Sequence, residues 1–150
     1  MVYSISIRFL LMNWLTCMSN MSDKYDSIKT AGRTLQAYCY EASRNAGWWH
    51  NIATGQHNKD NPLTFSNKLC LIHSEVSEAM EADRKGLMDD KLAHRDGREV
   101  ELADAVIRIF DLAGAYDMDL GAAIAEKMEF NESRQDHKLE VRQAKGGKAY

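Results

Sequence analysis

Two pairs of carboxylates stand at helical spacing in the middle of the sequence. Glu75 and Glu78 lie three residues apart, and Glu101 and Asp104 repeat this spacing further along the chain. Residues three apart are neighbours on a helix, so each pair forms one acidic edge. If the two helices pack side by side, four carboxylates converge and repel one another unless a divalent cation neutralises them. Ligands that are all carboxylate oxygens select a hard ion, so the sequence predicts a site for Mg²⁺, with Mn²⁺ as the second candidate.

The residues around the second pair are otherwise apolar. From Val100 to Ala113 the charged side chains are Glu101, Asp104, Arg108 and Asp111, and they fall on one helical stripe about 80° wide. A helix of this composition is expected in the middle of its domain, where an unpaired carboxylate costs roughly several kcal/mol. The compensation is either a metal or a salt-bridge network. In such a network Arg108 pairs with Asp104 at i, i+4, and Asp111 either continues the stripe or answers Arg108.

A row of hydrogen-bond donors lies nearer the C-terminus. Lys127, Asn131 and Arg134 stand at i, i+4 and i+7, within about 60° of one another on a helix. Lysine and arginine with an amide between them suit phosphate oxygens. Alone, such a row is typical of a solvated helix face. Beside a metal site it would hold a polyphosphate, because the metal and the two cations together neutralise charge that carboxylates alone would repel.

Three residues of a loop offer aromatic and polar contacts. Trp48, Trp49 and His50 follow directly on a predicted helix end. A tryptophan pair in this position either closes the core or stacks a base, and stacking is worth about 1 to 3 kcal/mol. His50 is a polar neighbour that could contact the same ligand.

Helices are predicted to position all of these side chains. One proline and nine glycines among 150 residues favour helical structure. Apolar residues at helical spacing predict a first helix over about 25–46, stopped by Gly47, and a second that begins near Thr64 or Ser66 and ends at Lys85–Gly86.

Capping signals place two further helices. Asp96 with Glu99 three residues later forms a capping-box pattern that opens the third helix, and Asp119 can cap a fourth that runs to about Arg134. Four helices joined by short to medium loops predict an all-α bundle, and we expect one domain over residues 21–137.

The two ends of the chain, residues 1–20 and 138–150, are not predicted to belong to this helical domain. Residues 1–20 are apolar but too short to span a bilayer and lack a signal-peptidase site, and Met18 and Met21 offer later starts. We interpret them as an over-called start or a poorly ordered leader. Residues 138–150 are predicted to be a mobile polar tail.

The net charge and the cysteine content limit the classes of binding partner and the cellular compartment that we expect. A formal net charge of -3 provides no broad basic surface for duplex nucleic acid or an anionic membrane. Three cysteines without a C-x-x-C pair indicate neither a disulfide framework nor a zinc site, so a cytoplasmic location is expected.

The order of these motifs resembles that of the MazG-like all-α nucleoside triphosphate pyrophosphatases, particularly the short single-domain members carried by phages. The similarity covers residues 35–137 and follows E75-x-x-E78, E101-x-x-D104 and K127-x-x-x-N131-x-x-R134. The resemblance implies a bundle-like helical fold completed as a homodimer or homotetramer. It also implies Mg²⁺-dependent hydrolysis of a ribo- or deoxynucleoside triphosphate to the monophosphate and pyrophosphate.

The resemblance also implies roles for individual residues. The carboxylates of the first two motifs would hold the metal, with Glu78 or Glu75 orienting the attacking water, and the third motif would bind phosphates. The loop residues Trp48, Trp49 and His50 would contact the base. Within the superfamily, a dUTP-specific enzyme and a phosphoribosyl-ATP pyrophosphohydrolase are alternatives.

Two readings of other classes compete with this one. A di-iron helical bundle needs E-x-x-H pairs, and the sequence contains none. A non-catalytic helical interaction module would use the acidic stripe as a structural ion network. That module predicts no response of the melting temperature to Mg²⁺ and no released pyrophosphate.

Overall fold

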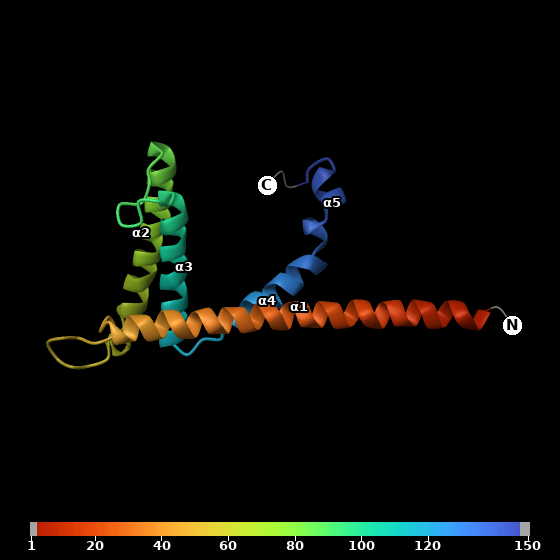
Figure 1. Cartoon of the computed structure of the whole chain (residues 1–150), viewed down its shortest axis with the longest axis horizontal. Coiled ribbons are helices and arrows are strands. Elements are labelled where there is room, and N and C mark those ends of the chain that lie inside the picture. The colour runs from red at the N-terminus through yellow and green to blue at the C-terminus, as the bar shows by residue number, and fades with distance from the viewer. Residues whose placement is uncertain (1–2, 148–150) are drawn as a thin grey trace. The chain divides into compact units, whose positions relative to one another are not determined.

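The computed structural model describes residues 3–147, with side chains for residues 23–147. Over this part the chain is all-helical and contains no strand, which confirms the all-α part of the predicted fold (Figure 1). The elements in chain order are α1 (Tyr3–Asn45), a 3₁₀ turn η1 (Asn58–Asp60), α2 (Thr64–Lys85), α3 (Gly97–Ala115), α4 (Leu120–Ser133), a 3₁₀ turn η2 (Gln135–His137) and α5 (Leu139–Gln143).

The chain divides into two compact units, which are described separately. One comprises residues 34–120, with the end of α1, the following loop, α2 and α3. The other comprises residues 1–33 and 121–150. The predicted carboxylate pairs and loop aromatics belong to the first unit, and the predicted donor row belongs to the second.

The first unit is built around a helical hairpin in which α2 and α3 lie side by side (Figure 1). The start of α3 lies close to α2 and to the loop that follows it, which favours a residue without a side chain there. A Cβ atom at Gly97 would lie 3.0 Å from the Leu87 carbonyl oxygen and 3.1 Å from the Ala82 Cβ. This side-by-side packing is the arrangement that the paired acidic motifs require.

The core of this unit sits at one end of the hairpin. Trp49, Leu112 and Ala115 form its buried centre, and Trp49 is completely buried. Partly buried apolar and aromatic side chains pack around them, namely Tyr40, Phe65, Ile72 and Tyr116. The end of α1 also approaches α3 closely here, since a Cβ at Gly114 would lie 2.5 Å from that of Tyr40.

The caps of α2 and α3 agree with the sequence-based predictions except at the start of α2. Asp96 is the N-cap of α3, as predicted, and its carboxylate accepts from the Arg98 N–H at 2.9 Å. Gly86 ends α2 in the left-handed conformation at φ 63°, also as predicted. The N-cap of α2 is Leu63, however, and not Thr64 or Ser66. The Thr64 hydroxyl instead donates to the Asn58 carbonyl at 2.7 Å, because η1 places that acceptor beside it.

Helix α3 is less covered than its composition suggests. Leu102, Val106 and Ile107 remain about half exposed, with relative accessibilities of 55%, 47% and 47%. The expectation of burial all round this helix is therefore wrong for the single chain, because α2 covers only one side of it. These three apolar side chains therefore stay accessible on the side of α3 that α2 does not cover.

In the second unit, the start of α4 meets α1 almost backbone to backbone. A Cβ at Gly121 would lie 2.5 Å from the Lys29 carbonyl oxygen, and one at Gly32 would lie 2.7 Å from the Gly121 Cα. An ion pair between the Lys24 Nζ and the Glu132 Oε1, at 2.5 Å, also joins the two helices.

The chain ends bear on two further expectations. Helix α1 begins at Tyr3, well before the predicted residue 25, and the side chains of residues 1–22 lie outside the described part. The interpretation of residues 1–20 therefore stays a prediction. Part of the expected tail is helical as α5, and residues 148–150 are also outside the described part. No helix among the described residues combines the length and apolarity that a membrane crossing needs.

Candidate metal centre and adjoining pocket

Three of the four predicted carboxylates meet between α2 and α3. One oxygen from each of Glu75, Glu78 and Glu101 lies within 4.8 Å of the others. Glu75 is buried at 5% exposure, Glu101 is half-buried and Glu78 is exposed. This group, which we call the acidic cluster, is therefore anchored in the hairpin and opens to solvent on one side.

The fourth predicted carboxylate, Asp104, is half-buried one helical turn along α3 from Glu101 and is not one of this group of three. Burial raises the pKa of Asp104, the charge on Glu75 raises it further, and Arg108 opposes the rise. Burial also raises the pKa of Glu101, followed by the charges on Glu78 and Glu75. Negative charge at this end of the hairpin is thus incompletely compensated by the protein.

Arg108 is the cation that faces the acidic cluster. Its Nε atom lies 2.7 Å from the Oε1 of Glu75, so the ion pair crosses from α3 to α2. The predicted i, i+4 pair with Asp104 is replaced by this contact, because Glu75 is the most buried carboxylate of the cluster and gains most from a partner.

Asp111 has a different environment from the cluster. It is buried at 5% exposure, and its Oδ1 accepts from the Trp49 Nε1 at 2.6 Å. Its Oδ2 accepts from the Lys68 Nζ at 3.2 Å, so the cation that pairs with Asp111 is Lys68 and not Arg108. The Lys68 Nζ also lies 4.3 Å from the centroid of the Trp49 ring. Asp111 is a fully partnered part of the core.

Lys68 is a residue that sequence reasoning missed. It lies seven residues before Glu75 on α2, which puts both on nearly the same face of the helix. That spacing was a usable signal for a cation on the acidic side of the hairpin.

The loop aromatics separate into two roles. Trp49 is completely buried against Tyr40 and Tyr116, and the His57 ring stacks on it at 5.6 Å between centroids. The predicted base contact of Trp49 is therefore replaced by a role in the core, since no face of its ring is exposed. Trp48 is 70% exposed and remains a candidate for stacking. His50 is exposed and lies beside His57, with 5.9 Å between ring centroids.

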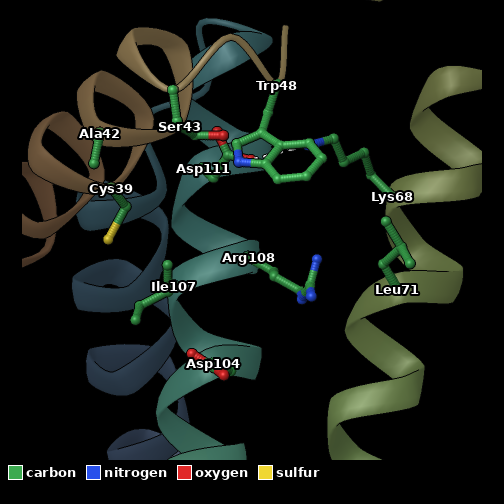
Figure 2. A pocket seen from close by; sticks show the side chains of 11 residues that line it. Cys39, Ala42, Ser43, Trp48, Lys68, Leu71, Asp104, Ile107, Arg108 and Asp111 are labelled. Carbon is green, nitrogen blue, oxygen red and sulfur yellow. Dashed lines mark hydrogen bonds and ion pairs between the residues drawn. The ribbon is translucent and has the colours of Figure 1, made fainter. Parts of the chain in front are cut away.

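A pocket of about 600 Å³ is lined by Arg108, the residue that contacts the acidic cluster, and by none of the three cluster carboxylates. Its wall includes Trp48, Lys68, Asp104, Arg108 and Asp111, together with apolar side chains such as Ile107. Figure 2 shows the Trp48 indole at one end, Asp104 at the other, and the Arg108 guanidinium extending from α3 toward α2 between them. The volume is within the usual range for small-molecule sites, about 300 to 1,000 Å³.

The predicted donor row lies in the other unit and is shorter than expected. Helix α4 ends at Ser133, so Arg134 follows the helix with an extended backbone, and its Nη2 pairs with the Asp136 Oδ2 at 2.7 Å. Lys127 and Asn131 do lie on α4, where the Lys127 Nζ sits 4.9 Å from the Phe130 ring centroid. Phosphate binding by these residues stays a prediction.

The chain matches none of the protein-family models, curated proteins or solved structures with which it was compared.

Proposed function

We propose that this chain is a Mg²⁺-dependent pyrophosphohydrolase that converts a nucleoside triphosphate to the monophosphate and pyrophosphate. The observation that carries the proposal is the convergence of Glu75, Glu78 and Glu101, next to Arg108 and the pocket of small-molecule size that it lines. The order of the acidic motifs, and their resemblance to the MazG-like pyrophosphatases, support the same activity. The bundle-like assembly of that family as a dimer or tetramer belongs to the proposal, and the half-exposed apolar residues of α3 are compatible with it.

The residues present fit a hard divalent ion. Three carboxylate oxygens are already within 4.8 Å of one another, and oxygen ligands are those that Mg²⁺ and Mn²⁺ prefer. The raised pKa values of Glu101 and Asp104 arise from burial and from neighbouring carboxylates. A divalent cation would relieve that repulsion, which the single guanidinium of Arg108 leaves in place.

When bound, the ion would supply Lewis-acid chemistry, lowering the pKa of a water and withdrawing charge from the α-phosphate. The exposed Glu78 is the carboxylate best placed to orient that water and accept its proton. The water oxygen attacks the α-phosphorus, and the bond from that phosphorus to the bridging oxygen breaks. The bridging oxygen leaves as part of pyrophosphate, so no covalent intermediate with the protein is required.

The pocket would hold the nucleoside portion of the substrate. Trp48 presents an exposed indole at its wall, and Ile107 adds an apolar side chain to the same wall. Base stacking on such a ring contributes about 1 to 3 kcal/mol without selecting strongly among bases. The proposed function therefore assigns Trp48 to the base and leaves Trp49 to the core.

A panel of all ribo- and deoxynucleoside triphosphates with Mg²⁺, monitored for monophosphate and pyrophosphate, tests the activity. We expect at least one triphosphate to be hydrolysed, and the preferred base also separates a general enzyme from a dUTP-specific one. Phosphoribosyl-ATP is included as a separate substrate. The variants Glu78→Gln and Glu101→Gln should lose pyrophosphate release while keeping their helical content.

Glu81→Gln is the matched control, because Glu81 lies one turn beyond Glu78 on α2 and pairs with Arg84 and Lys85. It should retain activity. Activity retained by either Glu78→Gln or Glu101→Gln would defeat the metal assignment.

A structural ion network in a helical interaction module is the second candidate. The ion pairs Arg108–Glu75 and Lys68–Asp111 favour it, because both join α2 to α3. It predicts that no triphosphate is hydrolysed and that Mg²⁺ leaves the melting temperature unchanged.

A further inference from the structure

We propose that Arg108 is an exchangeable counter-ion that pairs with Glu75 in the metal-free protein and binds substrate phosphate once a divalent ion occupies the acidic cluster. This role rests on the proposed function. It adds a substrate-binding residue, and it predicts that Arg108 and the metal oppose each other.

The first support is the position of Arg108 between two features of the unit. It contacts the acidic cluster through Glu75 and also lines the adjoining pocket. Figure 2 shows its guanidinium projecting across the space between α3 and α2. A phosphate of a ligand in the pocket would therefore lie within reach of the same group that now contacts the cluster.

The second support is the asymmetry of the ion pair. The Glu75 side chain is 6% exposed, whereas that of Arg108 is 41% exposed. Among the described residues, the guanidinium makes a single ion pair, through Nε, although it carries five N–H donors in a planar fork. The arginine thus has donors left for a second, bidentate partner such as a phosphate.

The third support comes from the other cation of the pocket wall. The Lys68 ammonium donates to Asp111 and lies over the Trp49 ring, and its side chain is only 18% exposed. Releasing Lys68 would leave Asp111 buried with only one partner. Arg108 is therefore the cation of this wall that can turn to a ligand at low cost.

The fourth support is competition for one carboxylate. A metal held by Glu75 and an arginine paired with Glu75 draw on the same negative charge. Metal binding weakens the Arg108–Glu75 pair, and the released guanidinium then meets the phosphate charge that the substrate brings in. Arg108 would thus disfavour metal binding without substrate and favour triphosphate binding with metal.

Two measurements on Arg108→Gln test the proposal. Binding of Mn²⁺ alone, followed by electron paramagnetic resonance, should tighten by about tenfold relative to the wild type, within the usual range of coupling between two sites. With saturating Mg²⁺, the KM for the best triphosphate of the panel should rise by about tenfold or more, with a smaller effect on kcat. If Arg108 served only to hold α2 and α3 together, its loss would loosen the acidic cluster, and Mn²⁺ binding by Arg108→Gln would weaken.

Arg108→Lys is the second variant, and it keeps the charge without the fork. We expect its Mn²⁺ affinity to stay near that of the wild type and its KM to lie between those of the wild type and Arg108→Gln. If Arg108→Gln does not fold, Arg108→Lys still decides the phosphate role, because an unchanged KM in Arg108→Lys would contradict bidentate binding.

The outcomes separate this proposal from the proposed function. If wild-type protein hydrolyses a triphosphate but Arg108→Gln shows unchanged or weakened Mn²⁺ binding, the role of Arg108 is wrong and the activity stands. If wild-type protein neither binds Mn²⁺ nor releases pyrophosphate, the proposed function itself is wrong.

Discussion

The two ends of the α2–α3 hairpin differ in how far their buried carboxylates are matched by cations and hydrogen-bond donors. At one end, Asp111 has both an indole N–H and a lysine ammonium as partners and closes the core. At the other, Glu75 is equally buried but lies beside two further carboxylates, and Arg108 is the one cation that pairs with it among the described residues. Burial of an acid therefore does not mark a functional site in this protein. The two ends differ instead in the balance between acids and cations, and the proposed metal site lies at the unbalanced end.

This difference assigns opposite consequences to removing charge. Neutralising an acid of the balanced end leaves cationic and donor groups buried without a partner, which costs stability. Neutralising Glu78 or Glu101, the cluster acids that lie outside the Arg108–Glu75 ion pair, removes repulsion, so under the proposed function it should cost activity and not stability. Two aspartates seven residues apart on one face of α3 allow a direct test: Asp111, and Asp104, which neighbours the cluster and is repelled by Glu75.

The largest effect is expected for Asp111→Ala. It leaves the Lys68 ammonium and the Trp49 N–H without their shared acceptor, so the free energy of unfolding should fall by about 3 to 5 kcal/mol. Urea unfolding followed by circular dichroism measures this loss. Asp104→Ala is the matched control and should unfold at the wild-type midpoint or above it. Equal losses in both variants would remove the distinction between the two ends.

A smaller effect is expected for Trp48→Ala. The indole is 70% exposed at the pocket wall, so its removal should leave stability almost unchanged. If it stacks the base, the transition-state stabilisation expressed in kcat/KM should fall by about 1 to 3 kcal/mol. Ile52→Ala is the control, because Ile52 lies in the same loop, is 99% exposed and is absent from the pocket wall. A wild-type kcat/KM in Trp48→Ala would exclude stacking.

The smallest effect concerns pH and the acidic cluster without metal. The folded-state pKa values of Glu101 and Asp104 lie above their ordinary values of 4.5 and 3.8. The folded protein therefore holds these protons more tightly than the unfolded chain, so stability is greatest below the ordinary pKa values and declines as the pH rises through the raised ones. Glu81, Asp90, Asp96 and Glu132 have lowered pKa values and contribute the opposite trend, so the test is the change on substitution. With a chelator present, the melting temperature of Glu101→Gln should rise relative to that of the wild type as the pH rises through this window.

Neutralising Asp111 should affect the pH dependence of the melting temperature differently from neutralising Glu101. Asp111→Asn should lower the melting temperature at neutral pH and leave the decline itself in place, because the decline arises at the cluster. A pH dependence that vanished in Asp111→Asn and persisted in Glu101→Gln would reverse the roles of the two ends.

Sequence patterns predicted the parts of the site that depend on local geometry. The i, i+3 spacing of Glu75 with Glu78 requires only a helix, and the Asp96 cap and Gly86 stop depend on neighbouring residues. The meeting of Glu101 with the first pair needed one further assumption, that the two helices pack side by side, and the hairpin confirms it.

The partners of the charged residues were beyond those patterns. Arg108 reaches Glu75 rather than Asp104, and Lys68 reaches Asp111, because both contacts cross between helices whose rotation about their axes depends on core packing. The same packing decides that Trp49 is enclosed while its neighbour Trp48 is exposed. Arg134 left the predicted donor row because α4 ends one residue earlier, which is a boundary that helix propensity fixes poorly.

The central claim, that the acidic cluster binds a divalent ion, is tested most directly by melting temperature as a function of Mg²⁺ concentration. A ligand that binds only the folded state raises stability in proportion to the logarithm of its concentration above its dissociation constant. We predict a progressive rise for the wild type and for Glu81→Gln, and a much smaller rise for Glu78→Gln and Glu101→Gln. An equal response of all four proteins, or no response in any, would contradict the account.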